Sequence, residues 1–598
     1  MNTNNQGIKT REELPPEMCW DLTPLYASEQ DWEKDFEQLD LLLKDYQSFQ
    51  GHLQDSPSTL KKAFESGDRL FMLLEQLYVY AHLKNDEDTG NAVNSGRYDR
   101  ISAKHAEISG ETAWFLPEIM EMKAETFDAM KQDPELSFYQ RTFQEIERAR
   151  KHILSRAEER ILGMSAEIFD QSHSTFAKLN NADLTFPKIK NEAGQMVDLT
   201  HGNFIKFLQN PNREVRKAAF DNLYQVYGGL KHTFASLLGG TVKTASLHAK
   251  LRGHESARAA ALHSDHIPLT VYDRLIDNVH AGLPAIHHYF ALRAKKLNLD
   301  KIEMFDIHNP LFPSADIPVE WPQAVSLVKE AVKPLGDEYC RCLDKAFDER
   351  WIDVLECKGK RSGAYSSGTY RKNPYILMNF SGTLNCAFTL AHELGHSIHS
   401  YFSDHTQDFH YASYRIFVAE VASTTNELLL HHHLMNTAES QETKAYLLNH
   451  LIDEIRGTVF RQTMFAEFER DIHAMDEAGE PLTADSLSKH YWELNQLYHG
   501  DSVISNEAIQ YEWARIPHFH YNFYVYKYAT GMSAAAALAQ DILAGKTDRY
   551  LNFLKAGGSR DVIDIMKDAG VDFTTDQPVQ SMMQLFKDTV QELEKVLF

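Results

Sequence analysis

Cysteine is scarce in this chain of 598 residues, and long apolar runs are absent. The five cysteines are Cys19, Cys340, Cys342, Cys357 and Cys386. Their odd number and the lack of C-x-x-C spacing are typical of reduced thiols rather than of a disulfide framework. No run approaches the roughly 20 apolar residues that a membrane-spanning helix needs. The first thirteen residues also lack the apolar segment of a signal peptide. These absences predict a cytoplasmic protein that does not engage a membrane.

Positive charge is also in short supply. The chain has 61 Lys and Arg residues against 85 Asp and Glu, a net charge of −24. Such a balance argues against nucleic acid or an anionic membrane surface as the main partner. The apolar fraction of 43% is ordinary for a globular protein with a large core. A chain of this length holds either several domains or one large helical enzyme, and its oligomeric state does not follow from composition.

Helical periodicity dominates the chain, so the predicted fold class is mainly α. Residues 60–84, for example, carry apolar side chains at three- and four-residue steps. A β-hairpin is predicted over residues 184–199, where two short apolar runs flank a polar turn. This interruption is the expected boundary between an N-terminal helical domain, residues 1–185, and a second domain, residues 186–598.

A small β element is predicted in the middle of the second domain. Residues 351–357 and 374–380 have the composition of strands, and a loop rich in Gly, Ser and Tyr separates them at residues 358–369. The second strand leads directly into a helix. Its free edge is expected to hold an extended peptide through main-chain hydrogen bonds, as in β-augmentation. A two-stranded packing element is the alternative interpretation.

That helix, residues 383–403, contains the pattern H-E-x-x-H from His392 to His396. Positions i and i+4 lie on one face of a helix, so both histidines can present a ring nitrogen to one metal ion. Glu393 lies about 100° round the helix and can reach a water molecule on that ion. The alternative is a buried helix with two hydrogen-bonded histidines. An apolar stripe beside the histidines supports the helix (Ala387, Ala391, Leu394, Ile398 and Phe402).

Two residues of this segment indicate how the helix begins and packs. Thr383 is the expected N-cap. Gly395 lowers helix propensity by about 1 kcal/mol relative to Ala, so we expect it to permit the close approach of another backbone over a metal site.

A third ligand must come from elsewhere, because catalytic zinc takes three protein ligands. The extended pattern that places a third histidine after the helix is excluded, since His399 and Phe402 occupy its glycine and histidine positions. His399 lies about 10 Å along the helix from His392, so we expect it to form a hydrogen bond nearby rather than to bind the ion. Glu420 is flanked by small apolar residues and predicted to point inward, where a cation would offset the cost of burying it. Glu427, two turns further, has either a hydrogen-bonding role beside the site or a solvated position.

The motif His392-Glu393-Leu394-Gly395-His396, followed by Glu420, resembles the thimet-oligopeptidase family of zinc peptidases and most closely its bacterial branch, the oligoendopeptidases F. The resemblance covers nearly the whole chain and includes four further segments (Trp20-Asp-Leu-Thr-Pro-Leu-Tyr26, Ala182-Asp-Leu-Thr-Phe-Pro187, Asn379-Phe-Ser-Gly382 and Tyr526-Lys-Tyr-Ala-Thr-Gly531). It implies a mainly helical fold whose two halves enclose the zinc in a deep substrate channel.

The resemblance also implies a histidine and tyrosines over the zinc, from a segment near the C-terminus. His518 is the matching histidine, with Tyr526 and then Tyr524 favoured as the tyrosine that assists catalysis. Tyr521 and Tyr524 are expected to contact the substrate. The spacing differs from that of the mammalian branch, and an aromatic core helix is the alternative interpretation of this stretch.

The sequence thus predicts a zinc metalloendopeptidase that cleaves short, unstructured peptides at internal bonds. One Zn²⁺ ion is expected per chain, held by His392, His396 and Glu420, with Glu393 as the general base. His518 and a tyrosine are expected to donate hydrogen bonds to the oxyanion. A zinc carboxypeptidase or dipeptidase on a related scaffold and a catalytically silent peptide-binding protein are the alternatives. Against silence, no ligand or base of the motif is substituted.

Overall fold

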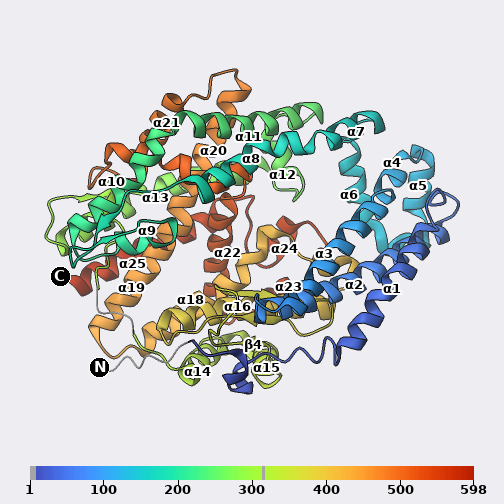
Figure 1. The fold of residues 1–598 in the computed structure, drawn as a ribbon, viewed down its shortest axis with the longest axis horizontal. Helices are drawn as coiled ribbons and strands as arrows, with labels where there is room; N and C mark the ends of the chain where they lie inside the picture. The colour runs from blue at the N-terminus through green and yellow to red at the C-terminus, as the bar shows by residue number, and fades with distance from the viewer. Residues whose placement is uncertain (1–7, 313–316) are drawn as a thin grey trace. The chain divides into compact units, whose positions relative to one another are not determined.

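The computed structural model describes residues 8–312 and 317–598 and shows a mainly helical protein with small β-sheets, as predicted (Figure 1). Residues 1–7 of the stretch examined for a signal peptide lie outside the described residues. The chain forms two compact units, each assembled from three segments (Met1–Lys151, Asp316–His433 and Leu538–Gly570 in the first; His152–Ala315, Leu434–Ala537 and Val571–Phe598 in the second). This grouping differs from a single division at residue 185, and the domain boundary there stays a prediction.

Long helices that lie side by side open the first unit (Figure 1). The side chain of Ser28 caps the first of them by accepting the amide N–H of Asp31, and Ser56 caps the second in the same way. Their buried faces share one hydrophobic core, to which Trp32 and Leu77 belong. The shorter helices α4, α5 and α6 follow the long helices α1, α2 and α3 (α1 Glu29–Gln47, α2 Pro57–Glu87, α3 Ala92–Thr112, α4 Phe115–Glu121, α5 Ala124–Gln132 and α6 Gln140–Arg150).

The β element of the first unit is a three-stranded sheet rather than a pair. β6 (Tyr375–Leu377) lies in the middle, parallel to β4 (Ile352–Asp353) and antiparallel to β5 (Tyr365–Ser367). Both edges of β6 are therefore paired, and the prediction that this strand offers a free edge is wrong. The outer strand is β5, which lies in the segment predicted to be a loop.

Among the remaining helices of the first unit, α16 packs against this sheet. Six residues separate the end of β6 from the start of α16, which fixes the first turn of the helix beside the sheet. Ser366 of β5 and Ser397 of α16 hydrogen-bond through their hydroxyl groups at 2.7 Å. These helices lie in the second and third segments of the unit (α14 Trp321–Ala331, α15 Gly336–Asp348, α16 Leu384–Thr406, α17 Phe409–Ala412, α18 Ala419–Thr437, α23 Thr547–Leu554 and α24 Val562–Asp568).

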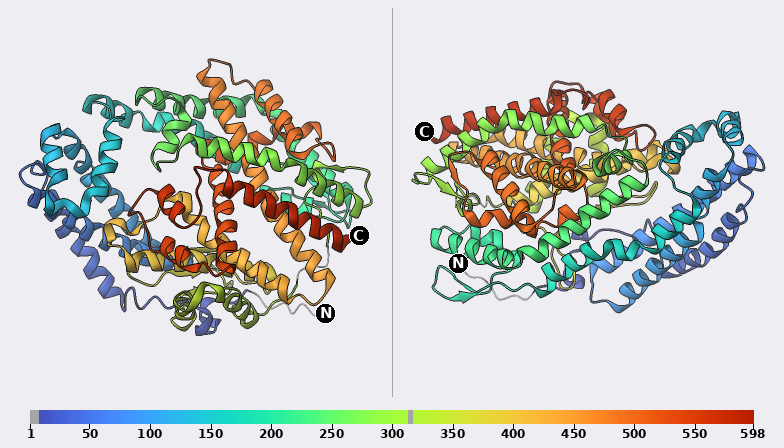
Figure 2. Two further views of the ribbon diagram at one scale, coloured as in Figure 1. Left: turned by 180° about the vertical axis from the view of Figure 1, so that it is seen from behind. Right: turned by 90° about the horizontal axis from the view of Figure 1, so that it is seen from above.

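The second unit is also helical, and α25 lies along α13 in it (Figure 2). The predicted hairpin is confirmed as β1 (Ile189–Lys190) and β2 (Met196–Val197), and β3 (Ile302–Glu303) pairs in parallel with β7 (Val503–Ile504). The helices follow in chain order (α7 Arg156–Met164, α8 Ala166–Lys178, α9 His201–Leu208, α10 Arg213–Gly229, α11 Lys231–Leu251, α12 Ala257–His263, α13 Leu269–Lys296, α19 Gln441–Ile455, α20 Arg461–Glu477, α21 Ala484–His499, α22 Tyr526–Leu543 and α25 Gln577–Leu597).

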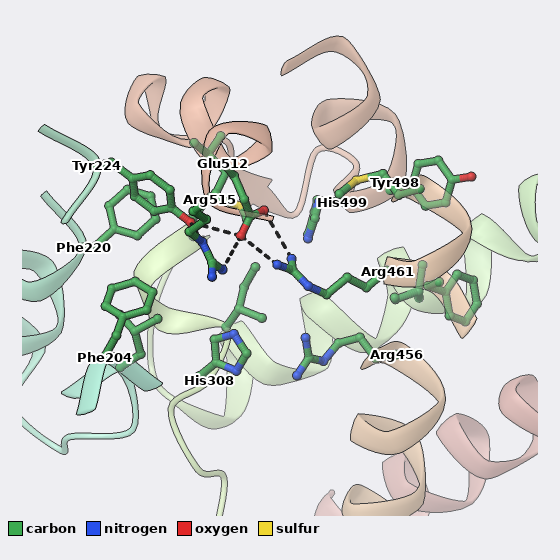
Figure 3. Close-up of a pocket in the computed structure, with 17 residues that line it drawn as sticks. Phe204, Phe220, Tyr224, His308, Arg456, Arg461, Tyr498, His499, Glu512 and Arg515 are labelled. Atoms are coloured by element: carbon green, nitrogen blue, oxygen red, sulfur yellow. Dashed lines mark hydrogen bonds and ion pairs between the residues drawn. The ribbon is translucent and has the colours of Figure 1, made fainter. Parts of the chain in front are cut away.

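One π-helical turn, η8 (Arg456–Phe460), joins α19 to α20 and borders an internal pocket (Figure 3). Among the described residues, no helix combines the length and apolar character required to span a membrane.

Candidate metal centre

The helix α16 carries the H-E-x-x-H motif, as predicted. Thr383 caps its first turn by accepting the amide N–H of Cys386 at 3.4 Å. The apolar stripe beside the histidines is buried, which fixes the rotation of the helix about its axis. Asn426 of α18 donates a hydrogen bond to the carbonyl oxygen of Ala391 at 3.0 Å and ties the two helices together. The histidines therefore face α18.

His392, His396 and Glu420 meet at one point between these helices. The Nε2 atoms of the two histidines lie 3.1 Å apart. Each of them lies 3.4 Å from Oε2 of Glu420. The three ligand atoms form a nearly equilateral triangle, and their side chains are only partly exposed.

The size of this triangle matches the donor set of a zinc ion. Zinc binds nitrogen and oxygen ligands at roughly 2.0–2.2 Å in a tetrahedron, whose edges are then about 3.3–3.6 Å long. The observed separations of 3.1 and 3.4 Å fall close to this range. Hydrogen bonds from His392 and His396 hold the pKa of the Glu420 carboxyl group well below its ordinary value. Two imidazole rings and one carboxylate form a ligand set that catalytic zinc commonly takes.

Gly395 permits the close approach of α18, as the sequence indicated. A Cβ atom at this position would lie 2.5 Å from Cα of Ser423 and 2.7 Å from the carbonyl oxygen of Ala422. Both are backbone atoms, so no side-chain rotation can relieve the overlap. The absence of a side chain at Gly395 thus sets how near Glu420, three residues before Ser423, comes to the histidines.

Glu427 holds a position beside the ligands rather than in solvent. Its Oε1 lies 3.3 Å from Nδ1 of His392. A carboxylate that accepts a hydrogen bond from the N–H of one ring nitrogen leaves the other nitrogen with its lone pair directed at the metal position. Of the two alternatives for Glu427, the structure supports the hydrogen-bonding one.

Glu393 lines the same pocket but stays out of the ligand triangle. Its side chain is 7% exposed, and burial raises the pKa of its carboxyl group. The pocket has a volume of about 360 Å³ and opens along the outer strand β5. A carboxylate of raised pKa beside a metal position is suited to accept and return a proton.

His399 lies behind the site and does not act as predicted. It is 1% exposed and stacks on Tyr414, with ring centroids 3.8 Å apart. Within the described part of the chain, neither ring nitrogen has a hydrogen-bond partner. The expected hydrogen bond near the site is therefore wrong. Burial lowers the pKa of this imidazole to about 3, so it packs as a neutral ring.

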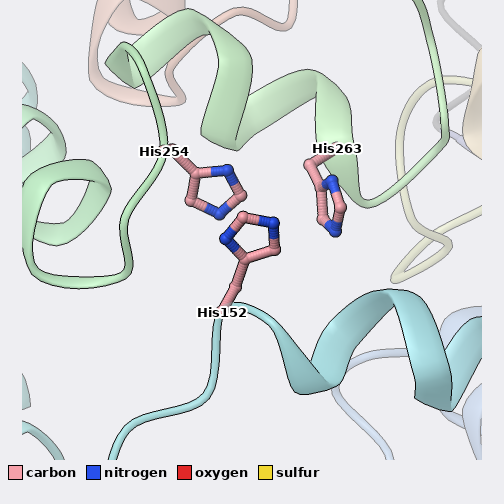
Figure 4. A group of neighbouring side chains, drawn as sticks. All are labelled: His152, His254 and His263. Atoms are coloured by element: carbon pink, nitrogen blue, oxygen red, sulfur yellow. The ribbon is translucent and has the colours of Figure 1, made fainter.

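A second group of histidines in the other unit has less suitable geometry. His152, His254 and His263 bring nitrogen atoms within 4.8 Å of one another. The rings of His152 and His254 are stacked 3.7 Å apart at an angle of 9° (Figure 4). The lone pairs of an imidazole lie in the plane of its ring, so two parallel stacked rings cannot both direct one at the same ion. The better metal site is the one on α16 and α18.

His518 and the predicted tyrosines belong to the second unit. The rings of Tyr524 and Tyr528 lie 6.2 and 6.0 Å from that of His518, and Tyr521 lies 6.1 Å from it. Tyr526 faces the interior instead: it is 1% exposed and its ring lies 5.0 Å from that of Tyr272. Tyr528 was missed by the sequence analysis, although its four-residue spacing from Tyr524 is a usable signal.

The turn that precedes α22 is strained. Asn522 and Phe523 adopt φ angles of +42° and +58°, which residues other than glycine rarely occupy. Oε1 of Glu469 accepts the amide N–H of Phe523 at 2.6 Å and helps to hold this conformation. Strained residues of this kind gather at functional sites, which agrees with a role for the neighbouring aromatic cluster.

Comparison with known proteins places this geometry in a family. Residues 206–585 match peptidase family M3, and residues 118–186 match the N-terminal part described as oligopeptidase F. The chain is 44% identical to oligopeptidase PepF of Bacillus subtilis over 99% of its own length and 89% of that protein.

Solved structures agree with the sequence comparison. A crystal structure of oligoendopeptidase F from Enterococcus faecium is 39% identical, with a TM-score of 0.73 over 95% of this chain and 99% of that one. A crystal structure from Chlamydophila abortus is 36% identical, with a TM-score of 0.93 over 98% of this chain and 100% of that one. The chain therefore belongs to peptidase family M3, as a metalloendopeptidase of the oligoendopeptidase F type that acts on oligopeptides.

Proposed function

We propose that each chain holds one zinc ion through His392, His396 and Glu420 and hydrolyses internal bonds of short, unstructured peptides. The observation that carries the proposal is the ligand triangle with edges of 3.1 and 3.4 Å. When bound, zinc supplies a Lewis acid that lowers the pKa of water towards about 7 and polarises the scissile carbonyl group. The remaining chemistry falls to residues of the chain.

Glu393 is the proposed proton carrier. Its carboxylate accepts a proton as water attacks the carbonyl carbon, and it passes this proton to the departing amine nitrogen. The burial that raises its pKa favours this exchange, because a more basic carboxylate takes the proton more readily. Because the Glu393 side chain is only 7% exposed, bulk water has little access to its carboxylate.

His518 with Tyr528 or Tyr524 is the proposed donor group for the tetrahedral oxyanion. Burial lowers the pKa of His518, so its ring is neutral near pH 7 and donates through one N–H. Each such donor contributes roughly 3 kcal/mol to transition-state binding in comparable enzymes. We place Tyr526, favoured from sequence, after these tyrosines because its side chain is buried against Tyr272. Tyr521, 52% exposed, is the proposed substrate contact.

β5 is the proposed holder of the peptide backbone. It is the outer strand of its sheet and borders the pocket that contains Glu393 and the metal ligands. An extended peptide added to this edge would pass the metal position with main-chain hydrogen bonds on one side. Such binding requires an unfolded substrate segment but no particular side chain.

Replacing Glu393 tests the mechanism. Glu393→Gln is expected to retain one equivalent of zinc and the wild-type unfolding midpoint while kcat falls roughly 10²–10⁴-fold, because an amide cannot accept the proton. Glu330→Gln, an exposed change on α14 of the same unit, serves as the control and should keep full activity. If Glu393→Gln kept more than about a tenth of wild-type kcat, Glu393 would not be the general base.

Substrate form separates the proposal from its alternatives. An internally quenched peptide blocked at both ends should be cleaved rapidly, whereas a stable folded protein at equal peptide-bond concentration should survive. A requirement for a free terminus would favour the carboxypeptidase or dipeptidase. Binding without cleavage by the zinc-loaded protein would favour a silent peptide-binding protein.

A further inference from the structure

The pocket beside the π turn η8 carries an unusual concentration of positive charge. It has a volume of about 40 Å³, room for roughly three water-sized spheres at 10–15 Å³ each. Arg456, Arg461 and Arg515 line it, together with His308 and His499. Figure 3 shows the three guanidinium groups and the ring of His308 turned toward one another.

The π turn explains why two of these arginines share one face. Arg456 and Arg461 are five residues apart, which in an α-helix at about 100° per residue would separate them by roughly 140°. In a π turn, residue i hydrogen-bonds to residue i+5, so the two positions lie nearly one above the other. The turn η8 (Arg456–Phe460) stands between them and brings both side chains to the cavity. π turns of this kind occur frequently at functional sites.

The one carboxylate that lines the cavity is already saturated. Glu512 accepts hydrogen bonds from Arg461 at 2.7 and 3.2 Å and from Arg515 at 2.7 Å. It also accepts hydrogen bonds from the hydroxyl groups of Tyr224 at 3.0 Å and Tyr491 at 2.6 Å. A carboxylate offers about four lone-pair sites. Glu512 therefore has no capacity left for the remaining N–H groups.

Several donors are left facing the cavity. Among the described residues, Arg456 makes one hydrogen bond, from Nε to Asp453 at 3.0 Å, so both of its Nη groups lack a protein partner. Arg515 uses Nε and Nη2 and leaves Nη1. Three arginines face Glu512 and Asp453, which leaves one positive charge in excess. Partly buried charges are stable when paired, so a compensating anion is expected.

We propose that this cavity is a binding site for one small inorganic anion of chloride size, held by Arg456, Arg461 and Arg515. The cavity volume excludes a peptide or a nucleotide. Arg515, the last residue of η9 (Glu507–Arg515), also lies three residues before His518 in the chain. An anion that fixes Arg515 thereby positions the segment that carries His518, a consequence that rests on the proposed function.

Binding is tested without reference to activity. Crystals of the full-length protein soaked in bromide should show an anomalous peak between the three guanidinium groups. In solution, 150 mM chloride should raise the unfolding midpoint by roughly 1 °C over gluconate at equal ionic strength, as expected for a site about 90% occupied in a chain of 598 residues. Arg456→Gln should abolish this difference and Arg456→Lys should keep part of it. Arg274→Gln, at a partly exposed arginine of the same unit that pairs with Asp576, should leave it unchanged.

The outcome that overturns the site is equally specific. Absence of a bromide peak in the cavity would show that water fills it and would overturn the site; equal midpoints in chloride and gluconate would agree with that result. The link to His518 is measured separately. For the wild-type protein, kcat on the blocked peptide should be several-fold lower in gluconate than in chloride, with little change in KM. For Arg456→Gln, the difference in kcat between the two salts should be smaller. Equal kcat in both salts would refute the link, while the bromide peak alone decides the site.

Discussion

Replacing Gly395 by alanine should weaken zinc binding although it touches no ligand. The added Cβ would lie 2.5 Å from Cα of Ser423, and ordinary contact begins at about 3.4 Å. The backbones of α16 and α18 must therefore separate by about 0.9 Å at this point. Glu420 lies on the same turn of α18, so its distance from His392 and His396 grows with the separation.

The magnitude follows from two opposing effects. Alanine favours the helix by about 1 kcal/mol relative to glycine, whereas overpacking a close contact costs about 1–3 kcal/mol. Folding stability should fall by roughly 0–2 kcal/mol. Ligand separations of 3.4 Å widened by most of 0.9 Å no longer fit one zinc ion. Zinc affinity should therefore fall tenfold or more, as it does when groups that orient metal ligands are changed.

The assay is a competition between the protein and chelators of graded strength, with zinc content and kcat/KM read at each step. Gly110→Ala is the matched control: Gly110 lies in the helix α3 of the same unit, and a Cβ there meets nothing within 4 Å. It should retain zinc and gain up to about 1 kcal/mol in stability. Wild-type zinc affinity in Gly395→Ala would refute the view that this helix contact sets the ligand geometry.

Three further changes have defined outcomes. Burial raises the pKa of Glu469 to about 8 from an ordinary value near 4.3. The uncharged carboxyl group therefore makes its full contribution to the free energy of unfolding below about pH 4, and this contribution is lost as pH rises through 8. Glu469→Gln should thus raise the unfolding midpoint at pH 9 but not at pH 4, and equal effects at both would contradict the assignment. Glu427→Ala should weaken zinc binding about 10–100-fold through His392, measured by chelator competition. Tyr528→Phe should lower kcat more than Tyr526→Phe does, and the reverse order would restore the sequence-based choice.

The candidate metal ligands could be proposed from the sequence, and the structure brings them together, because their signals are local. The spacing of His392 and His396 fixes a shared face wherever the segment is helical, and the apolar stripe shows that it is. Glu420 was found from the small apolar residues around it. Even the close helix contact at Gly395 followed from a local conflict, a residue of poor helix propensity in the middle of a helix.

Other features depend on partners that are distant in sequence. β5 is three residues long in a segment rich in Gly and Ser, and only its pairing with β6 makes it a strand. His399 became a buried, stacked ring because Tyr414 covers it. The choice between Tyr526 and Tyr528 depended on where α22 begins and on the strained turn before it. Local propensity reports none of these tertiary relations.

The central claim is most directly tested by anomalous diffraction at the zinc absorption edge, on protein purified without chelator. The account predicts one strong peak per chain, within bonding distance of Nε2 of His392, Nε2 of His396 and Oε2 of Glu420. A peak at His152, His254 and His263 instead, or zinc-free protein that cleaves the blocked peptide at the full rate, would contradict it.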